Sequence, residues 1–208
     1  MIACFHTEIT SEWTDEELRQ KAALIPDAII KAILAKRNHL DIQLSVSGYL
    51  LLLKLIKYFK ADVTLHDIIF NTYKRPGFNK DLDFNISHSG NRVICCATNE
   101  GKVGIDIEQV KPITINLDDY FNPAEQQYIR AAQNPESELI NYWTRKEAVL
   151  KAIGTGVFTP LLDIDVSTDT VISTNEICYL YTVGIDLAYK CNIAATVVQE
   201  TITKHCRL

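Results

Sequence analysis

Residues 142–154 read YWTRKEAVLKAIG, and this stretch determines what the second half of the chain can be. The stretch favours a helix that ends at Gly154, because glycine readily takes the left-handed conformation that closes a helix. Pro135 suits the first turn of the same helix. Trp143, Glu147 and Lys151 are spaced four residues apart, so they share one helix face. The core face is then left to Leu139, Ile140, Val149, Leu150 and Ile153.

The shared face of Glu147 and Lys151 has two interpretations. An acid followed by a base four residues later is an ordinary surface pair, which stabilises a helix by about 0.2–0.5 kcal/mol. The same pair beside a large aromatic residue could also belong to a functional site. This stretch alone leaves both interpretations open.

The composition describes a globular protein of one domain or two small ones. The chain has 208 residues, of which 47% are hydrophobic and 23% are charged. Its formal net charge of −5 gives no support for nucleic-acid binding as a global property. We therefore expect no nucleic-acid partner.

Cysteine usage and hydropathy favour a cytoplasmic protein. The six cysteines form no CxxC pair, so we expect reduced thiols and no zinc site. The first residues lack a basic start followed by a long apolar segment, so no signal peptide is expected. The most apolar run, residues 49–59, contains Lys54 and Lys57 and is too short to span a bilayer. We expect no membrane association.

The order of elements predicts an α+β fold made of two similar halves. Each half is expected to place a strand first, then a long helix, then further strands, as in residues 41–60 and the helix ending at Ile153. The predicted fold is thus two halves related by a pseudo-twofold axis, each a long helix on a small, mainly antiparallel sheet. The predicted boundaries are 1–101 and 102–208, and the second half carries the metal site proposed below. Strands are expected near residues 2–6, 82–87, 92–98, 103–108, 164–167, 177–183 and 190–198.

A second stretch, VGIDIE at residues 103–108, predicts a strand with two carboxylates on one face. Ile105 and Ile107 face a core, while Asp106 and Glu108 lie side by side, with open space expected at Gly104. Two carboxylates that close raise each other's pKa unless a cation lies between them. Mg²⁺ prefers such oxygen ligands. The alternative is a solvent-facing strand with two ordinary surface acids.

Glu147 would add a third carboxylate to this pair and so complete a typical Mg²⁺ arrangement. Such sites combine a few carboxylates with water and substrate phosphates, which indicates phosphate chemistry. Lys151, one turn further along the helix, could hold the same phosphates as a point charge.

A third stretch, FNISHSG at residues 84–90, places Ser87, His88 and Ser89 where a strand meets a turn. A hydrolase that uses serine as nucleophile and His88 as base is weakly indicated, because adjacent strand residues point apart and no GxSxG elbow is present. His88 could equally bind a phosphate or hydrogen-bond the turn.

The three stretches, taken in this order, resemble the 4′-phosphopantetheinyl transferases. The length is similar to that of the monomeric surfactin-synthetase-activating type, and FNPAE at residues 121–125 is similar to the family's Phe…Glu segment. The resemblance implies an enzyme that transfers the phosphopantetheine arm of coenzyme A to a serine of an apo acyl or peptidyl carrier protein. The other product is 3′,5′-ADP.

The resemblance also implies roles for the residues of the three motifs. Asp106, Glu108 and Glu147 would hold Mg²⁺ against the coenzyme A diphosphate, and Lys151 would contact the phosphates or assist the leaving group. His88 would bind the 3′-phosphate. The proton of the incoming serine would pass to Glu147 or to a metal-bound water.

The first half departs from the family pattern at two places. Arg75-Pro76 is similar to the family's Gly-Lys-Pro turn at the nucleotide, with Lys74 in place of glycine and Arg75 in place of lysine. The resemblance implies a coenzyme A contact for Arg75. The family's arginine on the long first-half helix is missing, so Lys36 and Arg37 are the candidates to supply that charge.

Two other functions stay open on the sequence alone. One is a catalytically inactive coenzyme A-binding protein of the same fold, and the other is the metal-independent hydrolase. Carriers of fatty-acid, polyketide and nonribosomal peptide biosynthesis are not distinguished. The loop predicted over residues 111–128 is a candidate surface for carrier docking.

Overall fold

The computed structural model describes residues 1–79, 82–173 and 176–208. The helices are α1 Asp15–Ala22, α2 Asp27–Leu34, α3 His39–Phe59, α4 Pro123–Ala131 and α5 Pro135–Ile153. The first six strands are β1 Ile2–Glu8, β2 Ile69–Phe70, β3 Pro76–Gly77, β4 Asp83–Ser89, β5 Arg92–Thr98 and β6 Val103–Gln109. The other strands are β7 Thr170–Ser173, β8 Glu176–Thr182, β9 Tyr189–Ala195 and β10 Thr201–His205.

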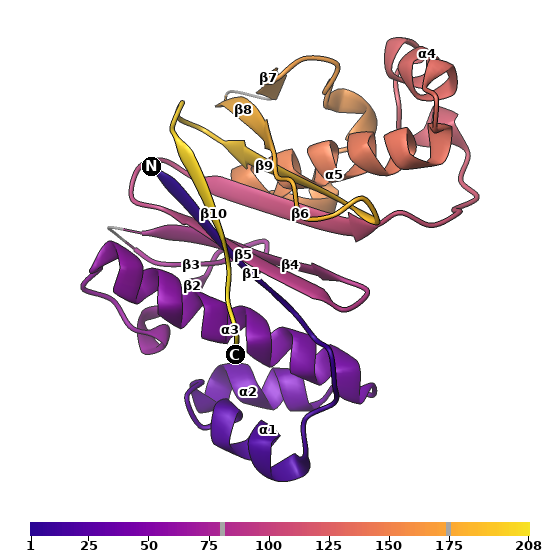
Figure 1. Ribbon diagram of the computed structural model, residues 1–208. Coiled ribbons are helices and arrows are strands. Elements are labelled where there is room, and N and C mark those ends of the chain that lie inside the picture. Colours follow the sequence, from indigo (N-terminus) through magenta and orange to yellow (C-terminus); the bar gives the residue numbers. More distant parts are fainter. Residues whose placement is uncertain (80–81, 174–175) are drawn as a thin grey trace.

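Two four-stranded sheets lie in the middle of the molecule, and a long helix covers the outer face of each (Figure 1). The first sheet has the order β10-β1-β5-β4 under α3, and the second has the order β6-β9-β8-β7 under α5. Helices α1 and α2 lie against α3 on the side away from the sheet (Figure 1). The predicted α+β fold is confirmed.

The two halves share one topology. Each half contains three antiparallel strands in the spatial order first, third, second: β1-β5-β4 in the first half and β6-β9-β8 in the second. The division at residues 101 and 102 stays a prediction. Strand β10, near the end of the chain, pairs parallel with β1 and so belongs to the first sheet.

Helix α5 begins and ends where the sequence predicts. Asn134 caps its start by accepting the backbone N–H of Ser137 at 3.0 Å, and Pro135 occupies the first turn. Gly154 ends the helix with a φ of 75°. The predicted core residues Leu139, Ile140, Val149 and Leu150 are buried, and Ile153 is partly buried against the same core.

Two predictions about the second half were wrong. Residues 123–128, expected within a loop, belong to α4, which begins with a capping box between Asn122 and Glu125. No strand forms at residues 164–167, and β7 begins instead at Thr170. The local signals at Asn122, Pro123 and Glu125 were sufficient to predict α4.

Three apolar clusters make up the core. One lies between α3 and the first sheet, one between α5 and the second sheet, and one between the two sheets. The cluster between the sheets includes Ile2 and Cys4 from β1 and Ile105 and Ile107 from β6. All six cysteines are free, and five of them are buried.

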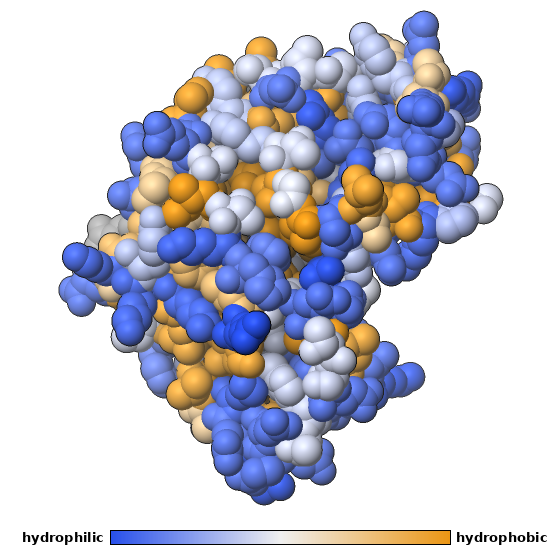
Figure 2. Space-filling view, viewed as in Figure 1, coloured by the Kyte–Doolittle hydropathy of each residue, from blue (hydrophilic) through white to orange (hydrophobic). Residues whose placement is uncertain are grey.

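One helix within the described part of the chain, α3, is long and apolar enough to cross a membrane by length and composition alone. Within the protein, 56% of the most apolar 18-residue segment of α3 is buried, because α3 packs on the first sheet. Hydrophilic residues cover most of the molecular face in Figure 2, and apolar residues form smaller patches among them.

The edge strands β4 and β6 are joined by side chains instead of by a backbone ladder. Four side chains of β4 accept hydrogen bonds from backbone N–H groups of β6, at a constant offset of twenty residues in the sequence. This side-chain ladder consists of Asp83 with Val103 at 2.8 Å, Asn85 with Ile105 at 3.0 Å, Ser87 with Ile107 at 3.3 Å and Ser89 with Gln109 at 3.1 Å.

We expect Asn85→Leu to lower the free energy of unfolding by about 1–3 kcal/mol, because the buried N–H of Ile105 loses its acceptor. Urea denaturation monitored by tryptophan fluorescence measures the change. Gln127→Leu, at an exposed site of α4, is the control for exchanging an amide for a leucine. A loss no larger than that of the control would contradict the structural role of the ladder.

Candidate active site

The side chains that the sequence analysis selected from the second half gather in one pocket with a volume of about 390 Å³. The pocket opens between the two halves, and β4, β6 and α5 line it. Its lining residues are Ile86, Ser87, His88, Asp106, Glu108, Trp143, Glu147 and Lys151. Trp143, Glu147 and Lys151 thus share a helix face that turns toward the carboxylates of β6, and not toward open solvent.

Gly104 brings α5 onto the carboxylate face of β6. A Cβ atom at Gly104 would overlap the backbone of Ala148 and Ala152. The prediction of open space at this glycine is therefore wrong, because the backbone of α5 fills that space. This close approach places Glu147 and Lys151 beside Asp106.

Asp106 is the most enclosed acid of the pocket, with 4% of its surface exposed. Its Oδ1 accepts hydrogen bonds from Lys151 Nζ at 2.6 Å and from Ser87 Oγ at 2.9 Å. Its Oδ2 is buried and makes no hydrogen bond with the described residues. Burial raises the pKa of Asp106, and the neighbouring Lys151 ammonium opposes that rise.

Glu108 and Glu147 are partly buried in the same pocket. Burial raises the pKa of Glu108, while Ser89 Oγ opposes the rise by donating to its Oε2 at 2.6 Å. Burial also raises the pKa of Glu147, and the charges of Asp106 and Glu108 raise it further. The three carboxylates therefore feel one another's charge, as expected for groups that require a cation.

The chemistry of these groups fits a hard divalent cation. Three carboxylates face one pocket, and the buried Oδ2 of Asp106 accepts no hydrogen bond from the part of the chain that the structure describes. As the side chains stand, no three His, Cys, Asp or Glu residues among the described ones converge closely enough to hold an ion. Lys151 Nζ provides the positive charge on Asp106 instead. The metal ligands Asp106, Glu108 and Glu147 stay a prediction.

His88 lies at the first-half side of the pocket and is partly buried. Burial lowers its pKa, and the positive charge of Lys36 lowers it further. Lys36 Nζ donates to Ser45 Oγ at 2.7 Å, so α3 holds this amine on the same side of the molecule as His88. Arg37 is exposed beside it.

Ser87 and Ser89 are occupied by the carboxylates. Each hydroxyl donates to an acid of β6 and accepts an N–H of the same strand. In the part of the chain that the structure describes, neither serine makes a hydrogen bond with His88, as a serine nucleophile and its base would. The arrangement does not favour the hydrolase alternative.

Comparison with known proteins identifies the family of this chain. The family model of the 4′-phosphopantetheinyl transferase superfamily matches residues 102–195. The 4′-phosphopantetheinyl transferase gsp of Aneurinibacillus migulanus is 34% identical over 181 residues, which are 80% of this chain and 76% of that protein. The chain belongs to the 4′-phosphopantetheinyl transferase superfamily.

Two further members of the superfamily match smaller parts. The 4′-phosphopantetheinyl transferase Sfp of Bacillus subtilis (strain 168) is 34% identical over 143 residues, which cover 62% of this chain and 63% of that protein. The 4′-phosphopantetheinyl transferase AcpT of Salmonella typhimurium is 30% identical over 151 residues, which cover 67% of this chain and 74% of that protein.

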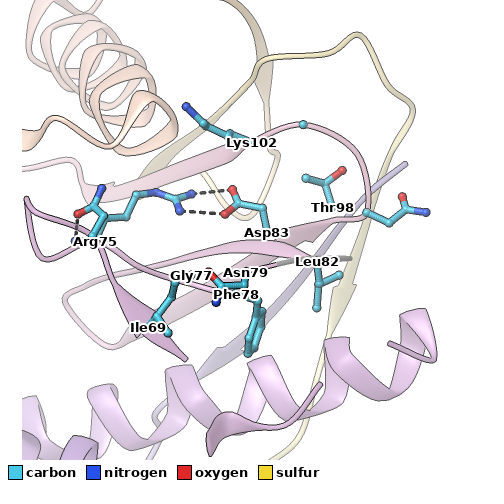
Figure 3. Close-up of a pocket in the computed structure, with 12 residues that line it drawn as sticks. Ile69, Arg75, Gly77, Phe78, Asn79, Leu82, Asp83, Thr98 and Lys102 are labelled. Carbon is cyan, nitrogen blue, oxygen red and sulfur yellow. Dashed lines mark hydrogen bonds and ion pairs between the residues drawn. The ribbon is translucent and has the colours of Figure 1, made fainter. Parts of the chain in front are cut away.

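Arg75 lies apart from the pocket of carboxylates. It lines a second cavity of about 390 Å³ with Asp83, to which its guanidinium is paired by two hydrogen bonds of 2.9 and 2.7 Å (Figure 3). A direct contact between Arg75 and coenzyme A stays a prediction. The contacts of Lys36, Arg37 and His88 with coenzyme A stay predictions as well.

A fully buried ion pair next to the site was not predicted from the sequence. Lys146 Nζ lies 2.7 Å from Glu125 Oε2, and neither side chain is exposed. Lys146 also donates to the carbonyls of Leu161 and Ile164, and Glu125 accepts the N–H of Val166. The pair thereby fastens residues 161–166 against α5 without a strand. Residue spacing gives no sign that these two charges meet.

Replacing Gly104 by alanine is expected to push α5 off β6. Because the new methyl group would overlap helix backbone, we expect a loss of about 1–3 kcal/mol in the free energy of unfolding. Gly184→Ala is the matched control, since a Cβ there meets nothing within 4 Å. Equal unfolding midpoints for the two variants in urea would contradict the close approach.

Breaking the buried pair should cost more than removing both charges. We expect Lys146→Met to lower the free energy of unfolding by about 3–5 kcal/mol, because Glu125 is left charged and unpaired. In Lys146→Met/Glu125→Gln the side chain carries no charge and its one oxygen can still accept one of the two backbone N–H groups that Glu125 accepts, so stability should partly return. Denaturant titration tests this, and a double variant less stable than the single one would refute it.

Proposed function

We propose that this protein transfers the 4′-phosphopantetheine group of coenzyme A to a serine of an apo acyl or peptidyl carrier protein. The serine oxygen forms a bond to the phosphorus next to the pantetheine arm. The bond from that phosphorus to the bridging oxygen breaks, and 3′,5′-ADP leaves with the bond's electron pair. The serine proton passes to a base on the enzyme.

The observation that carries this proposal is the single pocket in which His88, from the first half, meets Asp106, Glu108, Glu147 and Lys151, from the second. A diphosphate bears its charge over several oxygens, and this pocket offers it an ammonium and an imidazole. The same pocket offers an acceptor of the serine proton. Membership of the superfamily supports the same reaction.

Lys151 and His88 are the groups proposed to hold the phosphates. The Lys151 side chain lines the pocket and is partly exposed, so its ammonium can reach a ligand there while it stays near Asp106. Lys36 adds positive charge beside His88, which suits a phosphate at the first-half end of the site. Arg37, exposed next to Lys36, can add to that field.

Glu147 is the proposed base. Its carboxylate lies in the same pocket as Lys151, where it can accept the proton of the incoming serine. Its place on α5, one turn before Lys151, puts the proton acceptor next to the phosphate-binding ammonium. The proton of the serine therefore leaves close to the phosphorus under attack.

Mg²⁺ is the proposed cofactor, and Asp106, Glu108 and Glu147 are the residues that would hold it. When bound, the ion would neutralise charge on the diphosphate oxygens. Ser87 and Ser89 would keep two of these carboxylates oriented, because their hydroxyls already donate to Asp106 and Glu108.

We further propose a monomeric, cytoplasmic enzyme that binds neither nucleic acid nor membranes. The pocket is built from both halves of one chain, so no second copy is needed to complete it. The net charge of −5 supports the proposal that the protein binds no nucleic acid. The burial of α3 against the first sheet supports the proposal that it binds no membrane. The inactive coenzyme A-binding alternative is not favoured, since the full set of acids and Lys151 is present.

The decisive experiment is intact-protein mass spectrometry of apo carrier proteins from fatty-acid, polyketide and peptide-synthetase systems. Each carrier is incubated with this protein, coenzyme A and Mg²⁺, with EDTA in a parallel sample. We expect a mass gain of one phosphopantetheine that EDTA abolishes. Coenzyme A binding without any mass gain on the whole panel would instead favour the inactive binder.

Asp106→Asn should abolish most turnover and leave the fold intact. We expect the rate of carrier modification to fall at least about a hundredfold, because the variant removes the most enclosed charge of the site. The melting temperature should stay close to the wild-type value, since the loss of the Lys151 ion pair offsets relief from burying a carboxylate. Asp163→Asn, at an exposed position, is the control. A near-normal rate in Asp106→Asn would exclude this residue from the metal site.

A further inference from the structure

The guanidinium of Arg75 has no N–H group left for a ligand. Its Nε donates to the carbonyl of Lys151 at 2.7 Å, and both terminal nitrogens donate to Asp83. The remaining donors reach the carbonyls of Val103 at 2.9 Å and of Pro76 at 3.4 Å. Since arginine carries five N–H groups, these bonds engage all of them within the protein.

These bonds tie the first half to the two elements that carry the acids. Asp83 belongs to β4, Val103 begins β6, and Lys151 lies in the last turn of α5. Asp83 also accepts the N–H of Val103 at 2.8 Å, so one carboxylate and one guanidinium fix the three elements to each other. The pair is well enclosed, with 14% of the Arg75 side chain and 17% of the Asp83 side chain exposed.

Arg75 also meets a specific need of α5. The last carbonyls of a helix have no N–H partner within the helix, and its C-terminal end favours a positive charge. Arg75, from the other half of the chain, supplies both an N–H donor and a positive charge at this helix end. Asn71, in the same loop, donates to the carbonyl of Gly154 at 3.2 Å. A side chain at Gly154 would press on Arg75, so the glycine leaves room for this contact.

We propose that Arg75, held by Asp83, is a positioning residue for Lys151 and not a ligand of the nucleotide. By fixing the Lys151 carbonyl, it sets where the Lys151 side chain starts, and that side chain reaches Asp106 at 2.6 Å and Ser87 at 3.2 Å. Figure 3 shows Arg75 and Asp83 pointing toward each other across the cavity, with Phe78 and Leu82 beneath them. The Arg75–Asp83 pair that lines this cavity thus supports the pocket of carboxylates from outside it.

The first test measures the position of Lys151 without any substrate. The free protein is treated briefly with an amine-acylating reagent, and the labelling rate of each lysine is read by peptide mass spectrometry. We expect Lys151 to label several-fold faster in Arg75→Met and in Asp83→Asn, while Lys21 keeps its wild-type rate. The double variant should match the single ones, because both residues act as one unit.

Arg92→Met is the matched control variant. Arg92 also bridges the halves, by ion pairs of 2.8 Å to Glu8 and to Asp186, but within the described part of the chain it makes no hydrogen bond or ion pair with α5. General loosening between the halves would speed Lys151 labelling in Arg92→Met as well, which would overturn the proposal. An unchanged Lys151 rate in both Arg75→Met and Asp83→Asn would overturn it too. If Arg75→Met fails to fold, Asp83→Asn alone decides.

The second test rests on the proposed function. In carrier modification, kcat should fall about tenfold or more in Arg75→Met and Asp83→Asn, as expected when a reacting group is displaced. The KM for coenzyme A should change much less. A large rise in that KM in Arg75→Met but not in Asp83→Asn would show a direct nucleotide contact instead. If the wild-type protein modifies no carrier, the proposed function fails, while the labelling result still decides the role of Arg75.

Discussion

The contact between the halves depends on four side chains of β4 that supply hydrogen-bond acceptors to β6. An edge strand presents unpaired N–H groups, and each one buried without a partner costs about 1–3 kcal/mol. A backbone ladder would satisfy them by merging the two sheets into one. Side chains satisfy them while the sheets stay separate. Each half can therefore keep its own long helix and its own core.

The same ladder determines where the acids lie. Ser87 and Ser89 each accept an N–H of β6 and donate their hydroxyl to Asp106 or Glu108, so the hydroxyl orientation and the carboxylate position are coupled. Three acids that raise one another's pKa would otherwise separate. The packing of α5 on Gly104 prevents this, because the helix that carries Glu147 cannot withdraw from β6 without losing core contacts.

Local periodicity was sufficient to predict α5, β6 and the sharing of one face by Trp143, Glu147 and Lys151. It could not predict the ladder, since Asp83, Asn85, Ser87 and Ser89 alternate like the solvent face of any half-buried strand. It gave the wrong meaning to Gly104, because a glycine on a strand marks open space and close backbone approach equally well. The acidic partners of Arg75 and Lys146 lie eight and twenty-one residues away in the chain, and at these separations neither a helix nor a strand brings two side chains into contact.

The loop before Arg75 contains a residue in an unfavourable backbone conformation. Lys74 takes a φ of 63°, a left-handed conformation that costs a non-glycine residue about 1–2 kcal/mol. Asn71 stabilises it: its Oδ1 accepts the N–H groups of Tyr73 and Arg75 at 2.9 and 2.8 Å. Strain of this kind persists only where the surroundings determine it. Here Asn71 fixes the turn at one end, and the bonds of Arg75 to α5 and β6 fix it at the other. The loop therefore holds an unfavourable backbone conformation because the junction of the two halves requires it.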